Sequence, residues 1–471
     1  MGVPPHCLFS MIRIFKVVVP ASILALLLSE AVLITTCYIA SLFVLISADP
    51  ELFLLYEGGA LRIGLVTAVI ILGLYFSDLY SNIRVRSTFL LIQQVCLALG
   101  IAFISQAFLS YVNPELILPR WVMILGSSLV LVLLPTWRVL YSRYLVTAFG
   151  SRRCLFLGDS AALDELAEGA EERPELGLNV LGYIFSTERP MNSGMKYLGP
   201  VSKIREIVRE MKPDAIVVGM AERRQQLPMH DLLELRFSGV PVLEATKLYE
   251  TAFGRVNTRD LRPSQLIFTE ELGPNPANVA IQTVYNFIIA LAGIIILSPV
   301  LILTAIAVRL SSPGPILLRQ VRSGYQEKPY TLYKFRSMYQ DAEARTGAVW
   351  ASKNDPRITP IGIHLRRFRL DEIPQLFNVL KGEMAIAGPR PERPEFVQTL
   401  AEQIEFFRQR NCVKPGITGW AQINSGYSEN VEDVVRKLEY DLYYIKHLSF
   451  SLDFYIYFHT LKTMVLRRGS Q

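Results

Sequence analysis

The sequence is poor in cysteine and histidine, with five residues of each among 471. The cysteines are odd in number and scattered, which indicates neither a disulfide framework nor a cysteine-based metal site. The histidines are equally dispersed, and no histidine-based triad or Cys/His metal cluster is recognisable. Catalysis by thiols or imidazoles is therefore disfavoured.

Charged residues are also scarce. They make up 19% of the chain, whereas 51% of its residues are apolar, so the chain is too long for one domain and too hydrophobic for a soluble protein. Apolar runs at roughly 17–46, 61–76, 89–112 and 121–134 predict a bundle of four transmembrane helices. No small-residue cleavage site follows the first run, which predicts an uncleaved anchor.

Basic residues predominate before the first run, between the second and third runs and after the fourth, whereas acids dominate the loop after the first run. This contrast predicts that both ends of the bundle lie in the cytoplasm. The basic residues are Arg13, Lys16, Arg84, Arg86, Arg138, Arg143, Arg152 and Arg153. Glu30 lies inside the first run, and an acid at such a depth is a functional-site hypothesis. We favour a position near the cytoplasmic interface for it, because the run is long enough to begin near Leu26.

After residue 149 the pattern alternates between strands and helices, which predicts a small parallel α/β domain of Rossmann-like architecture. The expected strands are 154–158, 179–185, 215–218 and 240–243, and the expected helices are 161–170, 201–211 and 230–237. Only Gly158 stands where a dinucleotide-binding fingerprint has three glycines, so pyrophosphate binding is in doubt. A scaffold or oligomerisation role is favoured.

A fifth apolar run, 279–310, contains Ser298 and Pro299, and a proline there predicts a sharp kink. Cations flank both ends of the run. If it crossed the membrane, the rest of the chain would lie outside the cytoplasm, so we predict a re-entrant helix that returns to the same face. A proline-kinked spanning helix is the alternative. Residues 361–370 are basic and partly amphipathic, and 450–466 read as an interfacial helix, so both segments can rest on a membrane surface.

The segment Leu370-Asp-Glu-Ile-Pro-Gln-Leu-Phe-Asn-Val-Leu380 carries two adjacent acids. Its apolar spacing predicts a helix with Asp371 as the N-cap, and helix N-termini favour anions. An Asp-Glu pair alone is usually structural. Other motifs change that interpretation: Ser312-Pro-Gly-Pro315, Lys334-Phe-Arg-Ser-Met338, Asn354-Asp-Pro-Arg-Ile-Thr359, Gly388-Pro-Arg-Pro-Glu-Arg393 and Lys414-Pro-Gly-Ile-Thr-Gly-Trp-Ala-Gln422.

Together these motifs resemble the bacterial sugar transferase family of polyprenyl-phosphate phosphoglycosyl transferases, specifically its large membrane-bound type. The resemblance implies transfer of a hexose 1-phosphate from a UDP-sugar to polyprenyl (undecaprenyl) phosphate, with release of UMP. It implies that Asp371 is a covalent nucleophile and that Glu372 holds Mg²⁺. The cations expected around the phosphates are Lys334, Arg336, Arg357, Arg390, Arg393, Arg410 and Lys414.

The predicted fold is thus a four-helix membrane bundle (1–148), a Rossmann-like α/β domain (149–254), a linker (255–278) and a mostly α-helical monotopic catalytic domain (279–471) with its re-entrant helix. The expected location is the bacterial inner membrane with the catalytic domain facing the cytoplasm, and the expected role is to initiate exopolysaccharide, capsule or O-antigen assembly. Membrane lipids and a homodimer partner are expected, and nucleic acid is not. The sequence does not identify the hexose.

Two alternatives remain at this point. A nucleotide-sugar epimerase or dehydratase built on the middle domain would bind a nicotinamide cofactor, and the missing glycine fingerprint speaks against it. A non-catalytic membrane scaffold of polysaccharide assembly would leave Asp371 without a role in sugar transfer.

Overall fold

The computed structural model describes residues 11–14, 17–45, 49–80, 83, 85, 87–145, 151–187, 193–219, 227–260, 273–340, 356–426 and 430–465. Lys16, Arg84, Arg86 and half of the predicted linker lie outside the described residues. The chain forms two compact units, which divide between Ala245 and Thr246. Each unit is described below by itself.

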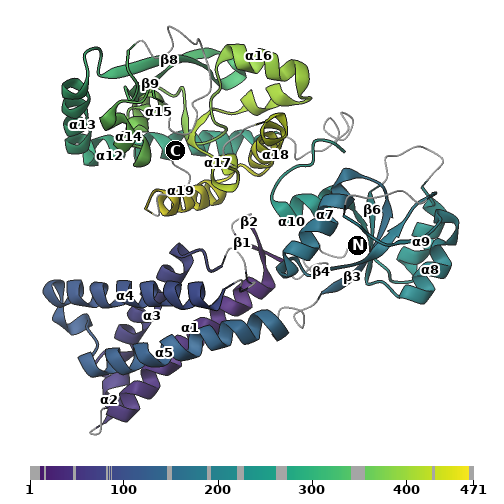
Figure 1. Ribbon diagram of the computed structural model, residues 1–471, viewed down its shortest axis with the longest axis horizontal. Coiled ribbons are helices and arrows are strands. Elements are labelled where there is room, and N and C mark those ends of the chain that lie inside the picture. Colours follow the sequence, from purple (N-terminus) through teal and green to yellow (C-terminus); the bar gives the residue numbers. More distant parts are fainter. Residues whose placement is uncertain are drawn as a thin grey trace. The chain divides into compact units, whose positions relative to one another are not determined.

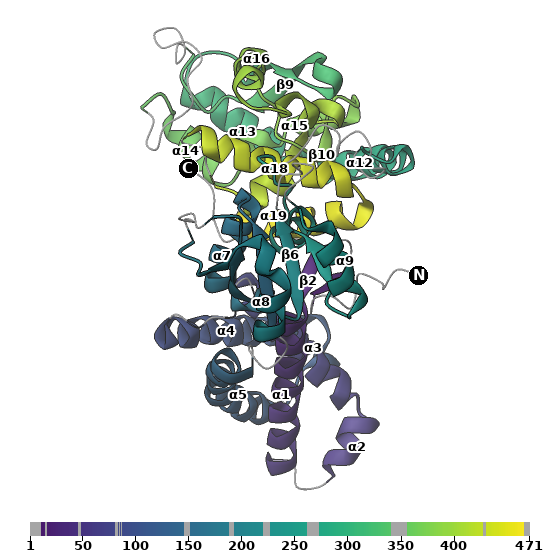
Figure 2. The same ribbon diagram turned by 90° about the vertical axis from the view of Figure 1, so that its right-hand side faces the viewer.

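The first unit begins with apolar helices (Figures 1 and 2). Two short strands, β1 (Met11–Ile14) and β2 (Val17–Pro20), precede α1 (Ala21–Leu45), α2 (Pro50–Leu55), α3 (Gly59–Phe76), α4 (Thr88–Val112) and α5 (Arg120–Leu140). Helix α1 packs on α3 and α5, and α4 packs on the same two helices. Among the described residues, four helical stretches here are long and apolar enough to cross a membrane, and they coincide with the predicted runs.

Glu30 is a structural residue of this bundle. Its side chain has no exposed surface and accepts hydrogen bonds from Arg138 of α5, 2.5 Å from Nε to Oε1, and from the hydroxyl of Tyr80 at 2.6 Å. Arg138 also donates to the carbonyl of Leu79 at 2.8 Å. A buried charge is tolerated when it is paired and hydrogen-bonded in this way. The acid therefore joins α1 to α5.

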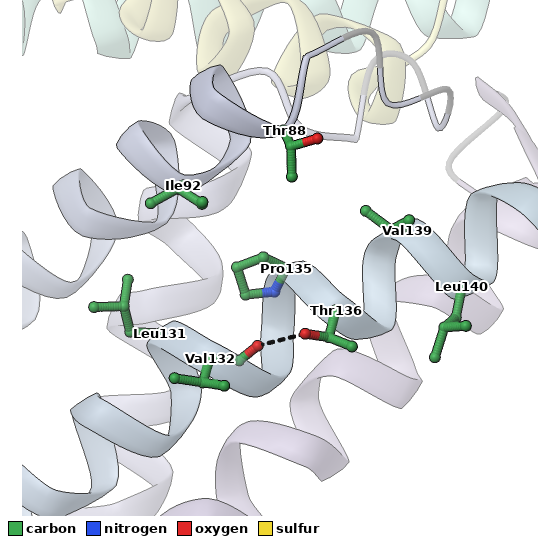
Figure 3. A pocket seen from close by; sticks show the side chains of 8 residues that line it. All are labelled: Thr88, Ile92, Leu131, Val132, Pro135, Thr136, Val139 and Leu140. Atoms are coloured by element: carbon green, nitrogen blue, oxygen red, sulfur yellow. Dashed lines mark hydrogen bonds between the residues drawn. The ribbon is translucent and has the colours of Figure 1, made fainter.

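An open groove of about 540 Å³ lies between α4 and α5 (Figure 3). Its walls are Thr88, Ile92, Leu131, Val132, Pro135, Thr136, Val139 and Leu140. The Thr136 hydroxyl donates its hydrogen to the carbonyl of Val132, so this hydrogen is not available to a molecule in the groove. In a bilayer such an apolar groove would be filled by lipid chains.

The rest of the first unit contains a parallel sheet in the order β5-β4-β3-β6-β7. Its elements are β3 (Arg152–Gly158), α7 (Ala161–Glu172), β4 (Leu178–Ile184), β5 (Tyr197–Gly199), α8 (Ile204–Met211), β6 (Ala215–Gly219), α9 (Met229–Phe237) and β7 (Val242–Glu244). Side chains from β3, β4 and β6 pack with α8 and α9, and α7 lies on the other face in Figure 1. The parallel α/β prediction is confirmed, and β5 is a strand that the sequence pattern did not reveal.

The second unit holds α10 (Ala245–Phe253) and every motif described above. Its further elements are α12 (Pro276–Ile296), α13 (Ser298–Ser311), β8 (Leu317–Ser323), β9 (Pro329–Phe335), α14 (Pro360–Arg367), η7 (Leu370–Glu372), α15 (Gln375–Leu380), β10 (Ala385–Ala387), α16 (Pro394–Gln403), η8 (Phe407–Cys412), β11 (Gly416–Thr418), α17 (Trp420–Asn424), α18 (Val431–His447) and α19 (Phe450–Val465). The strands form an antiparallel hairpin, β8–β9, and a short parallel pair, β10–β11. The unit is therefore mostly helical, as predicted, around two small sheets.

The apolar run of this unit is broken into two helices. Helix α12 ends at Ile296 and α13 begins at Ser298, with Pro299 in its first turn, where a missing N–H is tolerated. The chain changes direction between them (Figure 1). One side of α12 is buried at Gln282, Asn286 and Ala290, whereas its other residues are largely exposed and apolar. Helix α12 thus packs against the unit on one side, and its exposed side is mostly apolar.

Replacing one partner of the Glu30–Arg138 pair should destabilise the first unit. We expect Arg138→Met to lower the free energy of unfolding by about 3–5 kcal/mol, because it leaves a buried carboxylate unpaired. The double variant Glu30→Met/Arg138→Met should lose less than the single variant. Unfolding of the detergent-solubilised protein measures both effects, and a single variant as stable as the wild type would contradict the structural role.

Candidate active site

The two adjacent acids lie in a short 3₁₀ turn and not at a helix N-cap. Arg369 adopts a left-handed conformation, with φ of 54°, and the turn Leu370–Glu372 follows. Helix α15 begins only at Gln375, with Pro374 as its N-cap. The N-cap prediction for Asp371 is therefore wrong. The backbone is already helical on both sides of the acid, so its side chain is not used for capping and is free to face other groups.

Glu372 is the centre of a cluster of cations. Its Oε1 lies 3.0 Å from Nζ of Lys334 on β9 and 3.1 Å from Nη2 of Arg390, and its Oε2 lies 3.6 Å from Nη1 of Arg369. Burial opposes ionisation of this carboxyl, but the charges of Lys334, Arg390 and Arg369 outweigh it and hold its pKa well below the usual range. Glu372 is therefore an anion at any physiological pH.

Asp371 has a different environment from its neighbour. It is 8% exposed, and no described residue makes a hydrogen bond to its carboxylate. Burial and the charge of Glu372 raise its pKa to about 6, although Lys334, Arg366 and Arg390 act in the opposite direction. At neutral pH this carboxylate is ionised and is not engaged by any described donor. It has the properties of a nucleophile.

Arg390 is placed by a loop that has no regular secondary structure, residues 388–393. Neighbouring groups hold the carbonyls of this loop one after another. Gly416 donates its backbone N–H to the carbonyl of Pro389, Arg410 donates to that of Arg390, and Arg322 donates to that of Pro391, at 2.9, 3.0 and 3.1 Å. Gly388 is required here, because a Cβ atom would lie 2.5 Å from the carbonyl oxygen of Lys414. The side chain of Arg390 remains 45% exposed.

Two of the residues predicted to bind phosphate contact protein groups instead. Arg336 is buried and donates to the carbonyls of Pro313 and Ser312 at 2.7 and 2.6 Å, so it joins β9 to the end of α13. Arg410 is buried against Asp441 of α18, 2.7 Å from Nη2 to Oδ2, besides its bond to the loop. These contacts occupy the guanidinium groups with protein partners.

The remaining predicted cations are more peripheral. The backbone carbonyl of Arg357 accepts a hydrogen bond from the N–H of Tyr339, and Arg393 is the N-cap residue of α16. Lys414 is half-buried, and burial lowers its pKa. None of these three side chains contacts Glu372 within the described residues.

Sequence reasoning missed two cations of the site, because it assigned them to a membrane-surface stretch. Arg369 pairs with Glu372, three residues further on, which is a spacing that could have revealed it. Arg366 donates from Nε to the hydroxyl of Ser337 at 3.0 Å, and its charge lowers the pKa of Asp371. Asp441, the partner of Arg410, carries no motif signal.

The carboxylates of Glu372 and Asp371 could hold a magnesium ion together with a bound substrate. No group of three metal-binding side chains occurs among the residues that the structure describes. Mg²⁺ commonly binds one or two carboxylates together with substrate phosphates and water. Glu372 and Asp371 supply such carboxylates, and the surrounding cations suit phosphate oxygens. The arrangement can therefore bind a diphosphate beside a nucleophilic acid.

Comparison with known proteins points in the same direction. The family model for bacterial sugar transferases matches residues 277–467. A UDP-N-acetylgalactosamine-undecaprenyl-phosphate N-acetylgalactosaminephosphotransferase from Aeromonas hydrophila is 40% identical over 232 residues, which are 49% of this chain and 54% of the relative. The chain thus spans about half of that protein.

Other relatives are matched over more of their length. The UDP-glucose:undecaprenyl-phosphate glucose-1-phosphate transferase of Escherichia coli (strain K12) is 33% identical over 318 residues, 66% of this chain and 68% of the relative. The protein of the same name from Klebsiella pneumoniae is 32% identical over 329 residues, 69% of this chain and 70% of the relative. These matches extend beyond the motif-bearing unit.

The contacts of Arg336 predict a loss of stability on its substitution. We expect Arg336→Met to lower the free energy of unfolding by about 2–4 kcal/mol, because the carbonyls of Ser312 and Pro313 lose charged donors. Arg319→Met, an exposed position on the same hairpin, serves as control and should change it little. Thermal unfolding of the purified protein tests this. An Arg336→Met protein of wild-type stability with impaired turnover would instead place the side chain on substrate.

Proposed function

The chain belongs to the bacterial sugar transferase family, and on that basis we propose that it transfers a hexose 1-phosphate from a UDP-sugar to undecaprenyl phosphate, with release of UMP. The relatives named above carry this type of reaction in their names. One observation within the site carries the proposal. Asp371 is buried and accepts no hydrogen bond from any described residue, and the adjacent Glu372 pairs with Lys334 and Arg390.

In the proposed reaction a carboxylate oxygen of Asp371 attacks the phosphorus next to the sugar. A bond forms between that oxygen and phosphorus, the bond to the UMP oxygen breaks, and UMP leaves with the electron pair. A phosphate oxygen of undecaprenyl phosphate then attacks the same phosphorus, and Asp371 leaves as a carboxylate. Two steps through a covalent intermediate avoid a direct encounter of two phosphate esters, which repel each other.

The cations give the site its capacity for phosphoryl transfer, which depends on positioning and charge neutralisation. Lys334 and Arg390 lie on opposite elements around Glu372, so they can contact phosphate oxygens from two directions. Mg²⁺, when bound at Glu372, would neutralise the diphosphate and help UMP to leave. Arg366 is placed to attract a phosphate toward Asp371 and keep the carboxylate ionised.

We also propose that the α12–α13 pair enters the membrane and returns to the same face. The start of α12 is held by the catalytic unit, because Gln282 contacts Ala387 and Asn278 donates to the carbonyl of Leu448. The end of α13 packs on the same unit, where Val308 contacts Phe335. Contact of both ends of the helix pair with one unit supports a re-entrant hairpin over a spanning helix. The site then lies at the cytoplasmic face of the bacterial inner membrane.

The proposed product is a lipid-linked sugar that initiates exopolysaccharide, capsule or O-antigen assembly. A homodimer is part of the proposal, with the middle α/β domain as scaffold. No residue of the site selects one hexose by a contact among those described, so the donor has to be identified by experiment.

Asp371→Asn tests the covalent step. With UDP-sugar and Mg²⁺ but no lipid acceptor, the wild-type protein should release about one UMP per active site, since the phosphosugar remains on Asp371. Asp371→Asn should release none, and Asp231→Asn, a surface control on α9, should behave as the wild type. UMP release across UDP-glucose, UDP-galactose and N-acetylated donors measures this. Full release by Asp371→Asn would assign the nucleophile to another residue.

Glu372→Gln tests the metal site. Its amide keeps the shape but loses the charge, so we expect the turnover rate to fall and the Mg²⁺ concentration for half-maximal rate to rise by about tenfold or more. Titration of UMP release with Mg²⁺ gives both values. A lower rate with an unchanged metal titration would remove Glu372 from the metal site.

A further inference from the structure

Asp453 of α19 is a fully buried acid without a cation. Its side chain has no exposed surface, and no described lysine, arginine or histidine pairs with it. It contacts three polar side chains instead, Tyr285 and Gln282 of α12 and Tyr444 of α18. An ionised carboxylate in such a place is costly, because neutral dipoles compensate a buried charge only in part.

The side chains around Asp453 have one polar hydrogen fewer than the number of short polar contacts they make. Gln282 Nε2 lies 2.8 Å from the Tyr444 hydroxyl and 2.7 Å from Oδ2 of Asp453, and the Tyr285 hydroxyl lies 2.5 Å from the same Oδ2. The Tyr444 hydroxyl lies 2.8 Å from Oδ1 and 2.9 Å from the carbonyl of Ala387. These five contacts, all of 2.9 Å or less, share the two amide hydrogens of Gln282 and one hydroxyl hydrogen from each tyrosine. A fifth hydrogen completes the set if it resides on Oδ1. A longer contact of 3.4 Å joins Gln282 Nε2 to the carbonyl of Ala387.

Burial also favours the protonated form of Asp453. It raises the pKa of the Asp453 carboxyl to about 6, while donors from Tyr285, Gln282 and Tyr444 oppose the rise. Tyr444 has one hydroxyl hydrogen, so it cannot donate to the acid and to the Ala387 carbonyl at once. The titratable groups that face Asp453 are Tyr285, Tyr444 and Tyr457, and none of them carries positive charge.

The carbonyl of Ala387 connects the Asp453 cluster to the active site. Ala387 ends β10, and the next residue, Gly388, begins the loop that places Arg390 against Glu372. Strand β10 contacts both α12 and α19, and these elements are drawn in Figure 2. The Ala387 carbonyl accepts from Tyr444 at 2.9 Å and from Gln282 at 3.4 Å, and Gly388 donates its N–H to the carbonyl of Thr418 at 2.9 Å. The Tyr444 hydroxyl thus makes the shorter of these two side-chain contacts at the residue that precedes the loop.

We propose that Asp453 is a neutral, protonated acid that donates to Tyr444, so that Tyr444 can hold the Ala387 carbonyl and thereby position Arg390. Asp453 and Tyr444 are thus positioning residues for the active site. The same cluster includes Gln282 of α12, and it therefore connects the membrane-facing helix to the arginine loop. This inference rests on the proposed function for its kinetic readout but not for its spectroscopic one.

The substitution Asp453→Asn distinguishes a neutral acid from an anion. Its amide nitrogen can donate to Tyr444 and its oxygen can accept from Gln282 and Tyr285, as the protonated acid does. UMP release by Asp453→Asn should therefore stay within about threefold of the wild type, whereas Asp453→Leu and Tyr444→Phe should lose about tenfold or more, the effect of one essential hydrogen bond. Tyr333→Phe, which removes a surface hydroxyl bonded to Lys381, is the control.

Two further measurements separate positioning from mere folding. In an Arg390→Met background, Tyr444→Phe should cause little additional loss, because its effect passes through Arg390. The infrared spectrum of the wild-type protein at neutral pH should contain the C=O band of a buried protonated carboxylic acid, and the difference spectrum against Asp453→Asn should isolate it.

The outcomes are distinct. If Asp453→Asn is as inactive as Asp453→Leu, Asp453 is not a neutral acid. The absence of a carboxylic acid band would overturn the same assignment. Equal losses from Tyr444→Phe with and without Arg390 would overturn the positioning role. If the wild-type protein releases no UMP with any donor, the proposed function fails, while the infrared result still decides the protonation of Asp453.

Discussion

The ion cluster around Glu372 is the contact on which the arrangement of the site depends. It joins three segments that are distant along the chain: strand β9 through Lys334, the 3₁₀ turn of the acids, and the arginine loop through Arg390. A buried carboxylate requires such partners, because its desolvation is unfavourable without them. The same charges keep Glu372 ionised while Asp371, one residue away, has a raised pKa and no hydrogen bond among the described residues. One cluster thus separates two adjacent acids into different chemical roles.

The arginine loop shows how an irregular segment can be held in one conformation. Its carbonyls are bound by a backbone N–H from β11 and by the guanidinium groups of Arg410 and Arg322. The carbonyl of Ala387, just before the loop, accepts from the hydroxyl of Tyr444. Each bond contributes modestly, but leaving any of these carbonyls without a partner would be unfavourable. Several arginines of the unit therefore act on the backbone and hold in place the few side chains that can reach substrate.

The helix pair α12–α13 connects this site to the apolar surface of the unit. Gln282 and Asn286 place amide groups on a helix that is otherwise apolar, and these amides contact β10, α18 and α19. Polar side chains on an apolar helix are retained where protein partners satisfy them. Helix α12 therefore has an exposed, mostly apolar side and a side that contacts β10, the strand that precedes the arginine loop.

The sequence by itself determined the apolar helices, the parallel α/β pattern and the chemical character of the motif at Asp371, because periodicity and residue type are local properties. It did not determine which cations meet Glu372. Lys334 on β9 and Arg336, just after the strand, are two residues apart, yet Arg336 binds backbone carbonyls beside α13 and Lys334 binds the acid. It also gave Asp453 the appearance of a mere interruption in an apolar stretch, and only the tertiary structure surrounds that acid with neutral donors. Partners of this kind are brought together by packing between segments far apart in the chain, and no local pattern records them.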